Sequence, residues 1–200
     1  MAQIVDYYMS TSSPWTYLGS NIFTEMTQKI GAKVNVFPVN FSSIFPVSGG
    51  LPLPKRAPQR QAYRLMELKR WKQRRNSIMH IQPKNFPSIA PISSLAIVAA
   101  REMGEDALTL SNAILKALWE EDQNIDDIEI IKQVCDVCKL SSGLIIDNAS
   151  STKIMKIFEK DTENAIQKGV FGAPTYVIDN ELFWGQDRLD FVDQKLNGSQ

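Results

Sequence analysis

The sequence predicts an α/β protein in which a long helical segment interrupts a small unit of strands and helices. Three observations lead to this fold class. The first 40 residues follow a strand, helix, strand pattern. Residues 56 to about 168 show helical patterns and little strand signal. From residue 173 onward the chain returns to two short strands and a closing helix.

The composition is that of an ordinary globular protein. The 200 residues are 44% hydrophobic and 22% charged, and 22 basic side chains balance 22 acidic ones. The length suits one domain, or one domain with a large insertion. Zero net charge argues against nucleic acid or an anionic membrane as a partner. The N-terminus lacks signal-peptide features and no apolar run suits a membrane span, so we expect a reducing, cytoplasmic location.

The N-terminal elements come from local signals. Residues 3–9, QIVDYYM, alternate in the manner of a strand. Ser13 then fits a helix N-cap and Pro14 the first helical position, while Gly31 fits the stop of that helix. Residues 32–40, AKVNVFPVN, predict a second strand. This β-α-β order favours parallel strands joined by a right-handed crossover.

The middle of the chain reads as helical after one loop. Residues 41–58 are rich in proline, glycine and serine and predict that loop. A basic helix follows, because residues 55–75 hold nine lysines and arginines against one glutamate. Prolines then interrupt the pattern between residues 81 and 91. Further helices are expected near residues 89–103, 105–120, 126–139 and 149–168.

The tail completes the predicted fold. APTYVID and ELFW predict two strands joined by a tight turn at Asp179-Asn180. GQDRLDFVDQKL predicts a helix with Asp187 as its N-cap and Asp190 three residues later. The whole order is that of a thioredoxin-like fold interrupted by an all-helical insertion. We expect residues 1–43 and 168–200 to form the thioredoxin-like domain and residues 44–167 the helical insertion domain.

The corner before the first helix is the leading candidate site. A helix N-terminus offers free N–H groups and partial positive charge, which in Cys-x-x-Cys proteins lowers the pKa of a cysteine. Ser13 stands at that corner and cannot form such a thiolate. Its hydroxyl is suited instead to donate a hydrogen bond to a thiolate from outside. Spacing alone favours the simpler interpretation, that Ser13 merely caps the helix.

Several segments together resemble a known family. They are STSSPWTYLGSNIF at 10–23, VSGGLPLPKR at 47–56, RQAYRLMELKRW at 60–71 and GVFGAPTYVIDNELFWGQDRL at 169–189. The chain resembles, nearly end to end, the 2-hydroxychromene-2-carboxylate isomerases. It is also similar to the kappa-class glutathione transferases, in the DsbA-like branch of the thioredoxin fold.

The resemblance implies glutathione as cofactor and assigns residues to it. Ser13 would be catalytic and would hydrogen-bond the glutathione sulfur. Ala173, before Pro174, would pair through its backbone with the cysteinyl part, and a cis bond there would present that backbone. In the W-G-x-D-R segment, which ends at Arg188, Gln186 and Asp187 would hold the γ-glutamyl end.

The resemblance also implies a reaction. A bound thiolate would add reversibly to a conjugated carbon and so interconvert 2-hydroxychromene-2-carboxylate and trans-o-hydroxybenzylidenepyruvate, or a related electrophile. The substrate would be a small molecule and the protein a homodimer. One alternative is a kappa-type glutathione transferase or peroxidase. Another is a redox-dead thioredoxin-like module that binds an extended peptide beside the proline.

Substrate-binding candidates are less well defined. Trp15 and Trp184 could wall an aromatic site, or could belong to the core. Gly50 stands near the place where family members often carry an asparagine that touches cofactor or substrate. In the basic segment, the residues near the loop could meet a carboxylate: Lys55, Arg56 and Arg60. Those farther along are expected to face solvent: Lys69, Arg70, Lys72, Arg74 and Arg75.

The only Cys-x-x-Cys pattern lies outside the corner. Cys135 and Cys138 fall within a predicted helix, on the same face as apolar residues. We interpret them as small core residues, because a redox motif would lie at a βαβ corner and zinc would need a second ligand pair. No metal site is expected. A disulfide oxidoreductase is therefore the weakest alternative.

Overall fold

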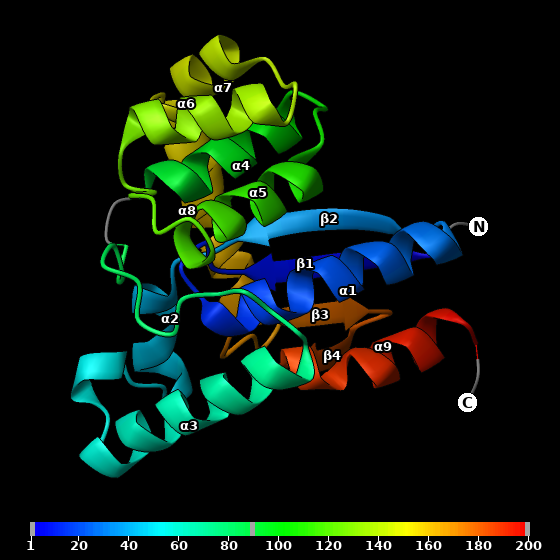
Figure 1. Ribbon diagram of the computed structural model, residues 1–200. Helices are drawn as coiled ribbons and strands as arrows, with labels where there is room; N and C mark the ends of the chain where they lie inside the picture. The colour runs from blue at the N-terminus through cyan, green and yellow to red at the C-terminus, as the bar shows by residue number, and fades with distance from the viewer. Residues whose placement is uncertain (1–2, 89–90, 199–200) are drawn as a thin grey trace.

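The computed structural model describes residues 3–88 and 91–198, and its centre is a mixed sheet of four strands (Figure 1). β1 runs parallel to β2 and antiparallel to β3, and β3 is antiparallel to β4, which gives the order β2-β1-β3-β4. The strands confirm all four predicted ones: β1 (Ile4–Met9), β2 (Lys33–Pro38), β3 (Thr175–Ile178) and β4 (Glu181–Trp184). One sheet therefore joins the two ends of the chain.

The predicted signals at the first helix and at the hairpin are confirmed. Helix α1 (Pro14–Ile30) begins after Ser13, whose side chain accepts from the Thr16 N–H, and ends at Gly31 with φ of 73°. The hairpin between β3 and β4 turns at Asp179 and Asn180, with φ of 50° and 65°. Two consecutive positive φ values are those of a type I′ turn, which suits asparagine and aspartate.

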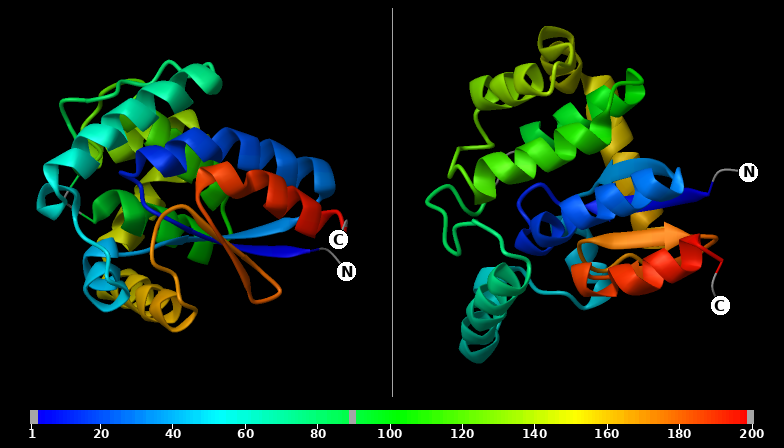
Figure 2. Two further views of the ribbon diagram at one scale, coloured as in Figure 1. Left: turned by 90° about the horizontal axis from the view of Figure 1, so that it is seen from below. Right: turned by 45° about the vertical axis from the view of Figure 1, so that its right-hand side comes forward.

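Helices cover both faces of the sheet (Figures 1 and 2). Because side chains alternate along a strand, β1 sends Tyr7 to one face and Tyr8 to the other. Tyr7 packs against Phe23 of α1, in the same cluster as residues of α9 (Leu189–Leu196). Tyr8 lies in a second cluster with Ala165 of α8 (Thr152–Gln167), which passes behind the sheet in Figure 1. This arrangement confirms the predicted thioredoxin-like fold with inserted helices, whereas the exact domain boundaries stay a prediction.

Between β2 and β3 the chain is helical, as predicted. The expected helices are α3 (Pro58–Arg74), α4 (Ile92–Glu102), α5 (Ala107–Trp119), α6 (Ile128–Val137) and α8. Positions 89–90 of the predicted helix at 89–103 lie outside the described residues. Three elements of this region were missed. The predicted loop at 41–58 instead holds α2 (Phe41–Ser48) and a 3₁₀ turn at Leu53–Lys55, and α7 (Ser142–Ala149) precedes α8.

Packing and capping explain why the missed helices form. Asn40 accepts a hydrogen bond from the Ser42 N–H at 3.0 Å and so caps α2. Ile44 of α2 is fully buried, and this packing outweighs the breaking tendency of Pro46. In α7, Ile145 and Ala149 are four residues apart, and both are buried.

The prediction that Asp187 caps the last helix is wrong. A 3₁₀ turn, η2 (Gln186–Arg188), comes first, and α9 begins only at Leu189 with no side-chain cap. The Asp187 carboxylate accepts from the neighbouring Arg188 guanidinium at 2.8 Å. Because the chain tightens into a 3₁₀ turn, Asp187 lies inside that turn instead of before the helix.

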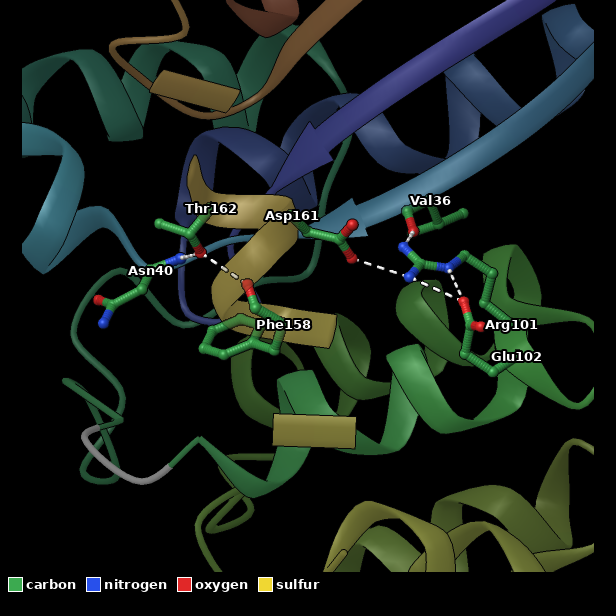
Figure 3. Close-up of polar contacts among 7 residues, drawn as sticks. All are labelled: Val36, Asn40, Arg101, Glu102, Phe158, Asp161 and Thr162. Atoms are coloured by element: carbon green, nitrogen blue, oxygen red, sulfur yellow. Dashed lines mark hydrogen bonds and ion pairs between the residues drawn. The ribbon is translucent and has the colours of Figure 1, made fainter. Parts of the chain in front are cut away.

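Two adjacent polar residues fasten α8 to the end of β2 (Figure 3). Asp161 accepts from Arg101 of α4 at 2.8 Å, and the same guanidinium donates to the Val36 carbonyl at 3.0 Å. The Thr162 hydroxyl accepts from the Asn40 N–H at 3.0 Å. The ion pair is largely buried, with exposed side-chain fractions of 17% for Arg101 and 9% for Asp161. Burial raises the pKa of Asp161, and Arg101 opposes that shift.

No helix within the described part of the chain combines the length and apolar character needed to cross a membrane. The same residues contain no group of three or more histidine, cysteine, aspartate or glutamate side chains that could hold a metal ion.

Replacing Arg101 with methionine should destabilise the protein by about 3–5 kcal/mol at neutral pH, because it leaves the Asp161 charge buried without its cation. The pKa of Asp161 is already raised, and it should rise further. An aspartate whose pKa is higher in the folded protein than its ordinary value of about 4 stabilises the folded state at pH values below that ordinary value. This stabilisation is lost as pH rises through the pKa of the folded state. The free energy of unfolding of R101M should therefore fall as pH rises, in urea titrations.

The matched control is Lys160→Met on α8, which removes an exposed ion pair with Glu163, where both side chains are 62% exposed. K160M should lower the free energy of unfolding by less than about 1 kcal/mol, and this decrease should depend little on pH. Equal losses for R101M and K160M would contradict a special role for the buried pair.

Candidate functional site

One large cavity opens at the end of the sheet where β1 and β2 finish and β3 starts. Its volume is about 1730 Å³. Segments far apart in the sequence line it: residues 10–15 after β1, residues 39–43 after β2, and residues 171–173 before β3. Side chains from α2, α3 and α8 complete the walls. The topology of the sheet therefore brings the predicted corner and the predicted proline edge to the same cavity.

Ser13 has an unused hydrogen-bond donor at this cavity. Its oxygen accepts from the Thr16 N–H at 3.2 Å, which confirms the predicted cap. Among the described residues its hydroxyl proton meets no acceptor. The residue lines the cavity. A hydroxyl both accepts and donates, so capping leaves the Ser13 O–H free for a ligand at the positive end of α1.

The Ala173-Pro174 edge offers free backbone groups to the same cavity. The peptide bond between the two residues is cis, which the sequence could not specify. The Pro174 carbonyl accepts from the Gly185 N–H at 2.9 Å. The N–H and C=O of Ala173 make no hydrogen bond with any described residue. This edge can therefore pair with an extended peptide segment.

The predicted substrate-binding residues divide into two groups. Trp15, Gly50 and Trp184 line the cavity. Trp15 is half-buried and packs against the core, whereas Trp184 is exposed and stands edge-on to Phe171 at 4.7 Å. Lys55 is exposed and lies outside the lining.

Position 50, which we compared with an asparagine of the resembled family, has no room for a side chain. A Cβ at this residue would collide with the Phe45 ring. An asparagine does lie at the cavity, however, at Asn40 directly after β2. Its amide oxygen caps α2, while its amide nitrogen donates to no described residue. The sequence does carry a signal for α2 and for this site residue, namely an asparagine, a common N-cap, directly after a predicted strand.

In the W-G-x-D-R segment only Trp184 lines the cavity, and the residues from Gly185 to Arg188 lie beside it. Gln186 is only 2% exposed, and its side-chain oxygen accepts from Arg75 at 3.0 Å. Arg75 also donates to the Gln186 carbonyl at 3.2 Å, so its predicted solvent-facing position is wrong. Asp187 and Arg188 are exposed and pair with each other. The Arg75–Gln186 contact spans 111 residues, and no local pattern reveals it.

The cysteines are remote from this chemistry. Cys135 of α6 is fully buried, which confirms its predicted place in the core, and Cys138 is partly buried at the end of α6. Neither lines the cavity. Burial raises the pKa of Cys135 to about 12 and also raises the pKa of Cys138. Both thiols therefore stay protonated and unreactive at neutral pH.

Comparisons with known proteins agree with this architecture. A sequence model described as "DSBA-like thioredoxin domain" matches residues 4–197. The chain is 23% identical over 198 residues to 2-hydroxychromene-2-carboxylate isomerase of Sphingobium xenophagum, across 98% of this chain and 99% of that protein. A solved 2-hydroxychromene-2-carboxylate isomerase superposes with a TM-score of 0.84 at 22% identity, over 98% and 95% of the two chains. The cytosolic disulfide reductase DsbM of Pseudomonas aeruginosa, solved with GSH, gives 0.69 at 14% identity, over 97% and 99%.

The thiols of the native protein should resist an aromatic disulfide reagent at neutral pH. A pKa near 12 lowers the thiolate fraction of Cys135 about a thousandfold relative to an ordinary thiol, and the label reacts with the thiolate. Labelling followed by absorbance should be slow in native protein and complete after unfolding in urea. Cys138→Ala isolates Cys135, and rapid labelling of that variant in its native state would contradict the assignment of Cys135 to the core.

Proposed function

We propose that this chain, which belongs to the DSBA-like thioredoxin domain family, is a glutathione-dependent isomerase. Its reaction is the interconversion of 2-hydroxychromene-2-carboxylate and trans-o-hydroxybenzylidenepyruvate, or of a related conjugated electrophile. The observation that carries the proposal is the Ser13 hydroxyl at the start of α1, which donates to no described residue. It lies in one cavity with the backbone N–H and C=O of Ala173, which pair with no described residue. The names and full-length coverage of the isomerase relatives support it.

The residues present fit a glutathione molecule. An extended tripeptide needs backbone partners, and Ala173 offers an N–H and a C=O that no described residue occupies. A thiol needs a donor that stabilises its anion, and Ser13 offers one. The cavity, about 1730 Å³, exceeds the few hundred Å³ that most small ligands need, so a tripeptide and a second molecule fit together.

Glutathione, when bound, supplies a thiolate that adds reversibly to a conjugated carbon, so that the neighbouring double bond becomes single and can rotate. The chain holds and tunes that sulfur. The Ser13 O–H and the positive end of α1 both favour the thiolate and lower the pKa of the thiol from about 8.5 towards neutrality. Trp15 and Trp184 give the cavity aromatic surface for a planar substrate.

The segment at Gln186 and Asp187 is proposed to receive the γ-glutamyl end. Because the Gln186 side chain is buried against Arg75, its contribution would come from the backbone of the η2 turn. The exposed Asp187 carboxylate would pair with the ligand ammonium. The ion pair between Arg188 and Asp187 would then break, because the ligand ammonium would take the place of the Arg188 guanidinium. A cytoplasmic location and a homodimer also stay predictions.

Two other functions use the same geometry. A transferase or peroxidase would bind glutathione at Ser13 but consume it, and a product that contains the tripeptide would identify a transferase. The unpaired edge of Ala173 equally suits a module that binds an extended peptide of another protein. Such a module would hold glutathione weakly and would not convert the small substrate.

Replacing Ser13 with alanine should lower glutathione-dependent turnover about 10- to 100-fold, because a hydrogen bond to a charged group is worth about 1.5–3 kcal/mol. The thiolate absorbance of protein-bound glutathione in the ultraviolet should titrate at higher pH in the variant. Turnover is followed by the absorbance of 2-hydroxychromene-2-carboxylate, and glutathione affinity by calorimetry.

Ser151→Ala is the matched control. Ser151 caps α8 in the same way, accepting from the Ile154 N–H at 3.3 Å, and lies outside the cavity lining. Both variants should lose about 0.5–2 kcal/mol of stability, whereas only the Ser13 variant should change the thiolate titration. A wild-type protein that neither binds glutathione nor converts the substrate would refute the proposal and favour the peptide-binding module.

A further inference from the structure

Three arginines place positive charge on one wall of the cavity. Arg56, Arg60 and Arg64 all line it and are spaced four residues apart. None of them forms an ion pair with a carboxylate of the described residues. Arg56 donates to the Leu51 carbonyl at 2.7 Å and so holds its own loop, while Arg60 is exposed.

Arg64 differs from its neighbours because an aromatic stack fixes its position. Its guanidinium carbon lies 5.3 Å from the centre of the Phe86 ring. Phe86 in turn packs on Trp119, at 5.2 Å between ring centres, and Trp119 is fully buried. A cation over an aromatic face is attracted by the negative face of the ring. The stack therefore presents a placed guanidinium to the cavity.

The hydrogen-bond donors of Arg64 have no acceptor among the described residues. No described residue accepts a hydrogen bond from its guanidinium, although the side chain is half-buried. Elsewhere on α3, Arg70 pairs with Glu67, and Arg75, directly after the helix, donates to Gln186. A half-buried guanidinium with unused donors is a typical receptor for a carboxylate, which it can bind through two parallel hydrogen bonds.

Electrostatics favour an anion at this point. Burial and the nearby Arg56 charge together lower the pKa of Arg64 to about 10. The side chain is still protonated at neutral pH, but its charge is disfavoured by its surroundings. A bound anion would oppose the shift, because a nearby negative charge favours the protonated guanidinium.

We propose that Arg64 binds the carboxylate of the substrate and so restricts the cavity to conjugated acids, excluding neutral enones of the same shape. The proposal rests on the proposed function and deepens it by naming the residue that selects the substrate class. Glutathione also carries carboxylates, so the test must distinguish that source from the substrate.

The test compares two ligands that differ only in the carboxylate. They are trans-o-hydroxybenzylidenepyruvate and the matching methyl ketone, trans-o-hydroxybenzylideneacetone. Each is titrated by calorimetry into protein saturated with S-methylglutathione, which has no free thiol and cannot react, and into protein alone. Wild type should bind the acid about 10- to 100-fold more tightly than the ketone, as expected for hydrogen bonds to a charged group.

Arg64→Gln should abolish this preference by weakening the acid and not the ketone, and Arg64→Lys should keep part of it. The affinity for glutathione itself should stay unchanged. Arg74→Gln is the matched control, because Arg74 stacks on Trp71 at 5.4 Å on the same helix but lies outside the cavity lining. Circular dichroism confirms that each variant is folded.

Three results would overturn the proposal. Wild type could bind acid and ketone equally, R64Q could weaken both alike, or R64Q could weaken glutathione and leave the acid unchanged. The last result would assign Arg64 to the tripeptide. If wild type fails to bind glutathione, the proposed function falls, yet the titrations without S-methylglutathione still decide whether Arg64 selects the acid.

Discussion

The pairing of β1 with two partners at once is the constraint on which the site depends. Met9 lies opposite Pro38 of β2, and Tyr8 lies opposite Thr175 of β3. Whatever follows β1 and β2 and precedes β3 must therefore meet at one end of the sheet. Ser13, Asn40 and Ala173 are brought together in this way, although each lies in a different part of the sequence.

The helices turn that end of the sheet into a cavity, and buried polar contacts hold them there. Asp161 and Thr162 of α8 fasten the last part of β2, and Thr162 does so through the backbone of the residue that caps α2. The positions of α2 and α8 in the cavity wall thus depend on a buried ion pair and one hydroxyl. Arg75 performs a similar task on the other side, where it connects the end of α3 to the η2 turn.

The sequence revealed those features that neighbouring residues determine. The cap at Ser13, the stop at Gly31 and the turn at Asp179-Asn180 each rest on the preferences of a few adjacent residues, and the structure confirms them. The features that were missed depend on partners far along the chain. Helix α2 forms in a proline-containing segment because Ile44 is buried, and no local pattern pairs Arg75 with Gln186 or Arg64 with Phe86. The cis isomer of the Ala173-Pro174 bond is likewise not specified by the residues next to it.

Cys135 is buried, and a serine stands at the corner where related redox proteins carry a cysteine. Together these two features determine how the protein responds to oxidants. A thioredoxin-like enzyme with its own reactive thiolate is exposed to oxidation, up to irreversible acids. Under the proposed function, this chain keeps its own two thiols protonated and away from the cavity, and it uses a diffusible thiol instead. Oxidant stress would then remove the reagent and not the catalyst. Activity would follow the supply of reduced tripeptide and would return with it, without repair or resynthesis of the protein.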